Sequence, residues 1–207
     1  IASMVDGLTK MSGVFNTESS EQAEYFRKVL LTLSDDVRVI IIKIADRLHN
    51  MRTLGAMPHN KQIKITSETI YLFVPLAHRL GLHAIKSELE DLCMRYRFPE
   101  EYEEITRKID DTETERQAYI EKFMAPIRAV LDKNKFQYEM TARVKSIYSI
   151  WNKMRRKNIP FEEVYDLFAI RIIFKTTPFP SEKTQCWQIY SCVTDIYKPH
   201  PDRLRDW

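Results

Sequence analysis

The sequence is poor in cysteine and histidine, and neither residue type occurs at the spacing of a redox or metal motif. Its three cysteines form no CxxC pair, and its five histidines form no HExxH or HxxxH pair. An odd number of cysteines fits buried thiols in a reducing cytosol better than a disulfide framework or a zinc site. We therefore predict a cytoplasmic protein whose histidines do not build a metal site by themselves.

Long apolar runs and a large net charge of one sign are absent too. No apolar run approaches the length that spans a bilayer, and the first residues lack a basic start followed by an apolar stretch. The net charge is only +3, which argues against a broad nucleic-acid-binding surface, and no predicted sheet face interleaves aromatic with basic residues. These absences predict no membrane partner, no direct DNA binding and no signal peptide among the residues given.

The 207 residues are enough for two small domains, and the hydrophobic period changes midway along them. In the first half, helices are predicted over 19–33, 36–54, 60–81 with a kink at Pro75, and 83–96. In the second half, a strand, a helix, a mostly buried strand and a helix are predicted at 136–140, 146–157, 167–174 and 182–197. An all-helical half followed by this alternating order predicts two domains of different fold class.

The segment from Glu100 to Glu121 is rich in both acidic and basic residues, with apolar residues at helical intervals. This pattern is typical of a long exposed helix that connects two domains. A helix packed inside the second domain fits the pattern equally well, so both interpretations stay open.

One predicted helix carries a distinctive set of polar residues. At about 100° per residue, one side is an apolar stripe and the other holds a carboxylate, an amide and a hydroxyl. The stripe consists of Ile41, Ile44, Leu48 and Met51, and the polar side consists of Lys43, Asp46, Asn50 and Thr53, flanked by Arg47, His49 and Arg52. Such a set offers one ligand for a hard cation and several donors to phosphate oxygens. A polar face packed on neighbouring helices is the more common explanation of the spacing.

A second set of charged residues surrounds the helix predicted over 146–157. It consists of Arg143, Lys145, Ser149 and Lys153, with Asp166 and Arg171 near the following strand. Cations and a hydroxyl beside a helix N-terminus suit a polyphosphate, because free backbone N–H groups and the helix dipole add to the side chains. Arg171, in an otherwise apolar strand, requires a ligand or a partner. The alternative, a solvated basic helix plus one salt-bridged arginine, is favoured by the residue pattern alone.

Five segments of the chain stand out as motifs. They are VDGLTK (Val5–Lys10), KIADRLHNMRTL (Lys43–Leu54), VPLAHRLGL (Val74–Leu82), RVKSIYSIWNKM (Arg143–Met154) and YDLFAIRIIF (Tyr165–Phe174). In this order they resemble the RelA/SpoT family, whose members make and degrade guanosine tetraphosphate and pentaphosphate, and the resemblance covers nearly the whole chain. It implies the C-terminal part of an all-helical His-Asp-type hydrolase domain (1–60), a helical bundle connector (61–99) and the N-terminal part of a nucleotidyltransferase-like mixed α/β synthetase domain (100–207).

For the first part, the resemblance implies a metal-dependent hydrolase that removes the 3′-pyrophosphate of guanosine tetraphosphate. Asp46 would be a catalytic metal ligand, commonly for Mn²⁺, and Asn50 and Thr53 would position the nucleotide. The family takes its other metal ligands from an upstream histidine and a His-Asp pair, and neither lies in Ile1–Trp207. Asp46 alone offers too few ligands to bind a transition metal tightly.

For the last part, the resemblance implies transfer of pyrophosphate from ATP to the 3′-hydroxyl of GDP or GTP. Arg143 and Arg171 would hold the adenine between their guanidinium planes, a geometry that lysine does not offer. The triphosphate would be contacted by Lys145, Ser149 and Lys153. Asp166 would be the catalytic ligand of Mg²⁺, which bridges phosphate oxygens.

Arg203-Leu204-Arg205-Asp206 resembles the basic RxKD signature of bifunctional family members, with Arg in place of Lys. We therefore expect a bifunctional parent enzyme, of which these residues are a central fragment with neither activity, and with the ribosome as a further partner through a region outside them. Two alternatives stay open: a synthetase whose hydrolase domain has decayed to a regulatory role, and a non-catalytic helical module that relays signals between domains.

Overall fold

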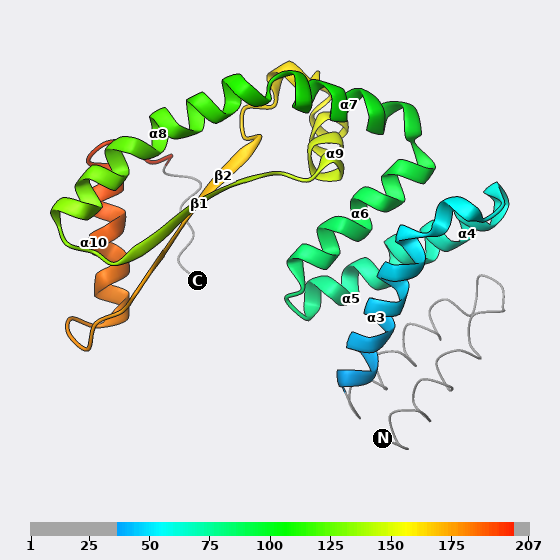
Figure 1. The fold of residues 1–207 in the computed structure, drawn as a ribbon, viewed down its shortest axis with the longest axis horizontal. Helices are drawn as coiled ribbons and strands as arrows, with labels where there is room; N and C mark the ends of the chain where they lie inside the picture. Colours follow the sequence, from blue (N-terminus) through cyan, green and yellow to red (C-terminus); the bar gives the residue numbers. More distant parts are fainter. Residues whose placement is uncertain (1–36, 201–207) are drawn as a thin grey trace. The chain divides into compact units, whose positions relative to one another are not determined.

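The structure is a computed structural model that describes residues 37–200, and it is mostly helical (Figure 1). The described residues form two compact units, one of residues 37–104 with 146–152 and one of residues 105–145 with 153–200. In chain order the described elements are α3 (Val37–Arg52), η1 (Leu54–Ala56), α4 (His59–Glu68), η2 (Thr69–Phe73), α5 (Val74–Arg79), α6 (His83–Arg97), α7 (Pro99–Asp111), α8 (Glu113–Lys133), β1 (Tyr138–Val144), α9 (Ile147–Lys157), η3 (Phe161–Glu163), β2 (Phe168–Phe174) and α10 (Glu182–Thr194).

This order agrees with the prediction of helices first, then strand, helix, strand and helix. The helical character of the first part is therefore confirmed. The likeness of the second part to nucleotidyltransferases and the functional division at residues 60 and 99 stay predictions. None of the described helices is both long and apolar enough to cross a membrane.

Helix α3 packs through one apolar stripe. Ile40, Ile44, Leu48 and Met51 are buried along it, at the intervals of three and four expected for one helix face. The prediction places Ile41 in this stripe and is wrong there, because Ile41 is 44% exposed. At 100° per residue Ile40 and Ile41 lie almost equally far from the middle of the stripe, on opposite sides of it, and packing buries Ile40.

Helices α4, η2 and α5 follow one another without a break, and η2 is a π-helical stretch in front of Pro75. Pro75 has no N–H for the carbonyl one turn earlier, and the N–H of Val74 bonds the oxygen of Thr69, five residues back. The run ends at Gly81, whose φ of +71° lies in the left-handed region. Leu82 N–H then bonds Ala77 O at 2.9 Å, which closes the helix end. The predicted end is confirmed, and the structure has a π-helical irregularity where the sequence predicts a kink at Pro75.

The first part of α9 belongs to the first unit, together with α6. Ile150 has no exposed surface, and the rings of Trp151 and Phe98 have centroids 4.8 Å apart. From Lys153 onward α9 belongs to the second unit. A single helix therefore contributes residues to both units.

The second unit contains a two-stranded antiparallel sheet of β1 and β2, in which Tyr138 pairs with Phe174 and Val144 with Phe168. Even-numbered residues of β2 are half-buried, and its odd-numbered residues are exposed. The prediction of a mostly buried strand is therefore wrong, since only one face is covered. The covered face packs around the buried residues Ile127, Leu131 and Ile189.

The charged segment after residue 99 divides into two helices at Thr112. Helix α8 buries Ile120, Met124, Ile127 and Leu131 and packs against α10 in the second unit. Within the segment Glu100–Glu121 itself, only Ile105 and Ile120 are buried, so neither interpretation of that segment is confirmed.

The cysteines differ in their surroundings. Cys93 is buried in the core of the first unit, and burial raises the pKa of its thiol to about 12, so it is an unreactive structural thiol. Cys186 is exposed and Cys192 is half-buried. The expectation of buried thiols is therefore wrong for Cys186, which lies beside the buried Gln185 of α10 but faces outward.

Three predictions fall outside the described residues. They are the helix predicted over 19–33, the VDGLTK motif and the stretch Arg203–Asp206.

Candidate functional site

The polar side of α3 has three exposed residues, whereas its Lys43 is half-buried. Asp46, Asn50 and Thr53 are all exposed. The Thr53 hydroxyl donates to the carbonyl oxygens of His49 and Asn50, at 3.2 and 3.3 Å, which holds it against its own helix. Asp46 and Asn50 therefore present the polar groups of this face that point outward for a ligand.

The arginines that flank this face have structural partners instead. Arg47 donates to Glu68 at 3.2 Å and lies over the Phe73 ring at 4.4 Å, with only 12% of its side chain exposed. Arg52 makes a bidentate pair with Glu88 at 2.6 and 2.9 Å. This pair raises the pKa of Arg52 and lowers that of Glu88, in each case chiefly through the hydrogen bond. For these two arginines the interpretation of a polar face packed on neighbouring helices is correct.

Asp46 does not form a metal site with other described side chains. Within residues 37–200, no three His, Cys, Asp or Glu residues gather in a way that could hold a metal ion. A single carboxylate does not fit tight Mn²⁺ binding, which needs three or more protein ligands. No chemical step through Mn²⁺ is derived from these residues.

Arg143 and Arg171 lie on the same exposed face of the β1–β2 sheet. Arg143 pairs with Ala169 and Thr141 pairs with Arg171, so the two arginines are diagonal neighbours across the strands. Such neighbours lie about 7–8 Å apart, within reach of long side chains. The prediction that Arg171 needs a partner to offset burial is wrong, because Arg171 is exposed.

Asp166 is held between two lysines just before β2 begins. Its two carboxylate oxygens accept hydrogen bonds from the ammonium groups of Lys145 and Lys153. Lys145 also donates its backbone N–H to Leu167 O at 2.8 Å, which fixes the end of β1 beside Asp166. The Asp166 side chain is 36% exposed. One partly exposed carboxylate fits Mg²⁺, which takes one or two protein carboxylates together with phosphate oxygens.

Ser149 lies in the first turn of α9, where the backbone donors already have partners. Tyr148 N–H donates to an Asp91 carboxylate oxygen at 2.8 Å, and Ser149 N–H donates to the Ser146 hydroxyl oxygen at 3.3 Å. The hydroxyls of Ser146 and Ser149 lie 2.8 Å apart. The expectation that free N–H groups at this helix end would serve a polyphosphate is therefore wrong for these two donors.

Asp91 is the residue that sequence reasoning missed. It lies on α6, 57 positions before its partner Tyr148, and no local spacing links the two. An acidic residue on the outer side of a helix gives no sequence signal for a contact with a distant helix end.

Comparison with known proteins defines the class of this arrangement. An HD domain model matches residues 1–83, and a model of the region found in RelA and SpoT proteins matches residues 142–207. These matches contain α3 and the segment from the last residues of β1 through α9 and β2, the two places where the candidate residues lie. The chain thus joins a helical HD-type domain to a RelA/SpoT region.

Proteins that match the whole of this chain agree with this class. The chain is 39% identical to a GTP pyrophosphokinase of Myxococcus xanthus over 211 residues, which are 100% of this chain and 27% of that protein. It is 38% identical over 208 residues to a guanosine-3′,5′-bis(diphosphate) 3′-pyrophosphohydrolase of Aquifex aeolicus, covering 100% of this chain and 29% of the relative. It is 35% identical over 208 residues to the bifunctional (p)ppGpp synthase/hydrolase SpoT of Escherichia coli K12, again 100% of this chain and 29% of the relative. Along its whole length the chain is thus similar to proteins of the RelA/SpoT family, and it spans less than a third of the length of these relatives.

Proposed function

We propose that this chain is the central part of a bifunctional enzyme of guanosine tetraphosphate metabolism. Its synthetase part would transfer pyrophosphate from ATP to the 3′-hydroxyl of GDP or GTP, and its hydrolase part would remove the 3′-pyrophosphate again. The observation that carries the proposal is the exposed pair Arg143 and Arg171, on the sheet whose end holds Asp166 between two lysines. Relatives named for each activity support it.

The arginine pair suits an adenine ring. A planar ring stacked on both sides needs about 7–8 Å between the two guanidiniums, which is twice the contact distance of about 3.5–4.0 Å. The backbone positions of diagonal neighbours in an antiparallel pair have about this separation, so two long side chains that extend side by side from them would leave room for a ring. Guanidinium planes attract an aromatic face on either side, so the pair would hold the base without reading its hydrogen-bonding edge.

The Asp166 cluster suits the triphosphate. Lys145 and Lys153 point their ammonium groups at one carboxylate in the ligand-free chain, and phosphate oxygens would replace that carboxylate as their partner. Asp166 would then be able to ligate Mg²⁺, which offsets phosphate charge during transfer. Ser149, one helical turn before Lys153, would add its hydroxyl as a further donor.

The binding of ATP to the 207-residue chain, with Mg²⁺ present, tests this proposal. We expect Arg143→Lys and Arg171→Lys each to weaken the affinity about tenfold, since lysine keeps the charge but lacks the planar face. Arg156→Lys is the matched control, because Arg156 is exposed in the last turn of α9 and lies on neither strand of the sheet. Isothermal titration calorimetry gives the three dissociation constants. An equal loss in all three variants would contradict the stacking role.

A second candidate function, the helical relay between domains, is favoured by two contacts of α6. Glu88 of α6 pairs with Arg52 of α3, and Asp91, one turn later, accepts from Tyr148 N–H at the start of α9. One turn of α6 therefore contacts the helix of the proposed hydrolase residues and the helix of Ser149. A rigid helix with contacts at both places would couple them, and linkage makes such coupling reciprocal.

The relay is tested in the parent protein by measuring nucleotide affinity at each site with and without a ligand at the other. We expect the ratio of affinities to depart from one and to return toward one in Glu88→Gln. The exposed Glu101 of α7 provides the control substitution Glu101→Gln. Affinities that are independent in the unmodified protein would rule the relay out.

A further inference from the structure

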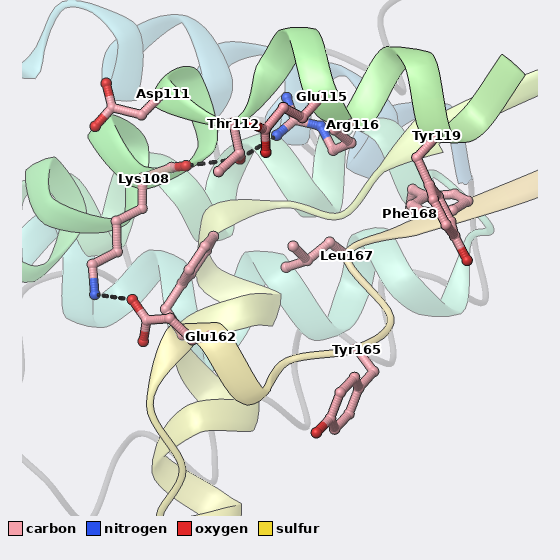
Figure 2. Close-up of a pocket in the computed structure, with 11 residues that line it drawn as sticks. Lys108, Asp111, Thr112, Glu115, Arg116, Tyr119, Glu162, Tyr165, Leu167 and Phe168 are labelled. Atoms are coloured by element: carbon pink, nitrogen blue, oxygen red, sulfur yellow. Dashed lines mark hydrogen bonds and ion pairs between the residues drawn. The ribbon is translucent and has the colours of Figure 1, made fainter. Parts of the chain in front are cut away.

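The second unit contains a cavity that neither candidate site uses. Its volume is about 620 Å³, within the range of about 300–1,000 Å³ that small-molecule sites occupy. Its walls come from the end of α7, the start of α8, η3 and the segment that leads into β2 (Figure 2). Tyr119 and Phe168 lie together at one end, and Lys108 and Glu162 lie together at the other.

Arg116 lines this cavity with an unsatisfied donor. Its Nη1 donates to Ile109 O at 2.7 Å and to the Thr112 hydroxyl oxygen at 3.1 Å, so the guanidinium is anchored to the end of α7. Its Nε is buried and has no hydrogen-bond partner. A buried N–H without an acceptor is costly, and in a folded protein it calls for a bound partner.

Arg116 also has no ion-pair partner among the described residues, unlike its neighbour. Lys108 pairs with Glu162 at 2.9 Å, whereas no ion pair among residues 37–200 includes Arg116. A ligand with one negative charge would balance this guanidinium. Asp111, Glu115 and Glu162 line the same cavity, so a polyphosphate would meet repulsion there.

The remaining walls are aromatic or apolar. The rings of Tyr119 and Phe168 meet edge to face, with centroids 5.9 Å apart, and Tyr119 is 59% exposed. Phe161 and Leu167 add apolar surface beside them. Such walls favour a flat aromatic ring.

We propose that this cavity binds a small planar aromatic monocarboxylate. The carboxylate would accept from Nε–H and the adjacent Nη2–H of Arg116, the side of the guanidinium opposite Nη1, in the bidentate geometry that arginine offers. The ring would lie against Tyr119 and Phe168. Tyr165 and Leu167, which flank Asp166 in sequence, line the cavity, so this ligand would contact the segment that carries the proposed Mg²⁺ ligand.

The test uses 2-naphthoate as the probe and NMR of arginine Nε–H resonances in the 207-residue chain, with no nucleotide present. The Arg116 resonance is assigned by its loss in Arg116→Lys. We expect it to shift on titration with a dissociation constant on the order of 1 mM, a reasonable affinity for a ligand of this size. A resonance that stays in place at about ten times that concentration would overturn the proposal.

Variants and related compounds identify the contacts. Arg116→Lys should weaken 2-naphthoate binding at least tenfold and Tyr119→Ala about fivefold, whereas the exposed Arg107→Lys on α7 should leave it unchanged; binding to the variants is followed by the ligand's own signals. Circular dichroism confirms that each variant is folded.

Cyclohexanecarboxylate, which lacks the flat ring, and 2-naphthalenemethanol, which lacks the charge, should each bind more weakly than 2-naphthoate. Equal binding by either compound, or an equal loss in Arg107→Lys, would reject the assignment. Since ATP is absent throughout, failure here leaves the proposed synthetase role untouched.

Discussion

The polar side of α3 and the β1–β2 sheet end differ in which of their charged residues are exposed. On α3 two arginines form ion pairs, Arg47 with Glu68 and Arg52 with Glu88, and the carboxylate of Asp46 is exposed. At the sheet end the carboxylate of Asp166 forms ion pairs with two lysines, and Arg143 and Arg171 lie on an exposed face of the sheet. An exposed carboxylate suits a cation, and exposed guanidiniums suit an aromatic or anionic group. The two places therefore offer complementary chemistry, although both are mixtures of acid and base in sequence.

The largest expected effect comes from removing each acid in the full-length parent protein. Asp46→Ala should abolish removal of the 3′-pyrophosphate and spare synthesis, because Asp46 is the proposed hydrolase metal ligand. Asp166→Asn should lower synthesis at least about a hundredfold and spare hydrolysis, because an amide does not offset metal charge. Separate assays of the two reactions measure both effects. Hydrolysis retained in Asp46→Ala, or both activities lost in either variant, would contradict this division.

The next largest expected effect is on stability, and it distinguishes the buried side of α3 from its exposed side. Ile44→Ala removes buried apolar volume and should lower the free energy of unfolding by about 2–5 kcal/mol. Ile41→Ala, three residues away on the exposed side, should change it by less than about 0.5 kcal/mol. Urea unfolding of the 207-residue chain measures both values. Similar losses in the two variants would mean that the stripe includes Ile41 after all.

The smallest effect is the pH dependence of the Arg52–Glu88 pair. The hydrogen bond to Arg52 lowers the pKa of Glu88 in the folded chain. The stabilisation is therefore complete above the ordinary carboxyl pKa and is lost as the pH falls through the lowered value. The melting temperature of the chain should exceed that of Glu88→Gln near pH 7, and the difference should shrink toward zero as the pH falls through the lowered pKa of Glu88. A difference that is independent of pH would show that Glu88 acts through packing and not through its charge.

Much of the fold follows from local sequence pattern. The end of the helical run at Gly81 and the order of strands and helices after residue 136 are confirmed, and a π-helical irregularity lies where the sequence predicts a kink at Pro75. These features depend on backbone geometry and on hydrophobic period, which neighbouring residues determine. The misplaced Ile41 shows where pattern reasoning fails, since two adjacent isoleucines are equally apolar and only packing selects Ile40.

Sequence pattern predicted the contacts of the candidate sites less well than the fold. Lys145 lies before α9 and Lys153 lies within it, and the structure brings both to Asp166. The same reasoning misjudged Arg171, because it could not tell a two-sided strand from a buried one. It also missed Asp91 and the buried Nε of Arg116, whose significance depends on contacts with other elements.

By itself the sequence determined which segments are helical, where they end, and which residue types are available to each candidate site, since these depend on interactions between near neighbours. Only the tertiary structure decided which charged residues pair with one another. Arg52 pairs with Glu88, Asp91 accepts a hydrogen bond from the start of α9, and Asp166 pairs with two lysines. The physical reason is that an ion pair or a hydrogen bond forms within about 3 Å in space. Residues tens of positions apart reach that distance only when the packing of the apolar stripes has brought their helices and strands together.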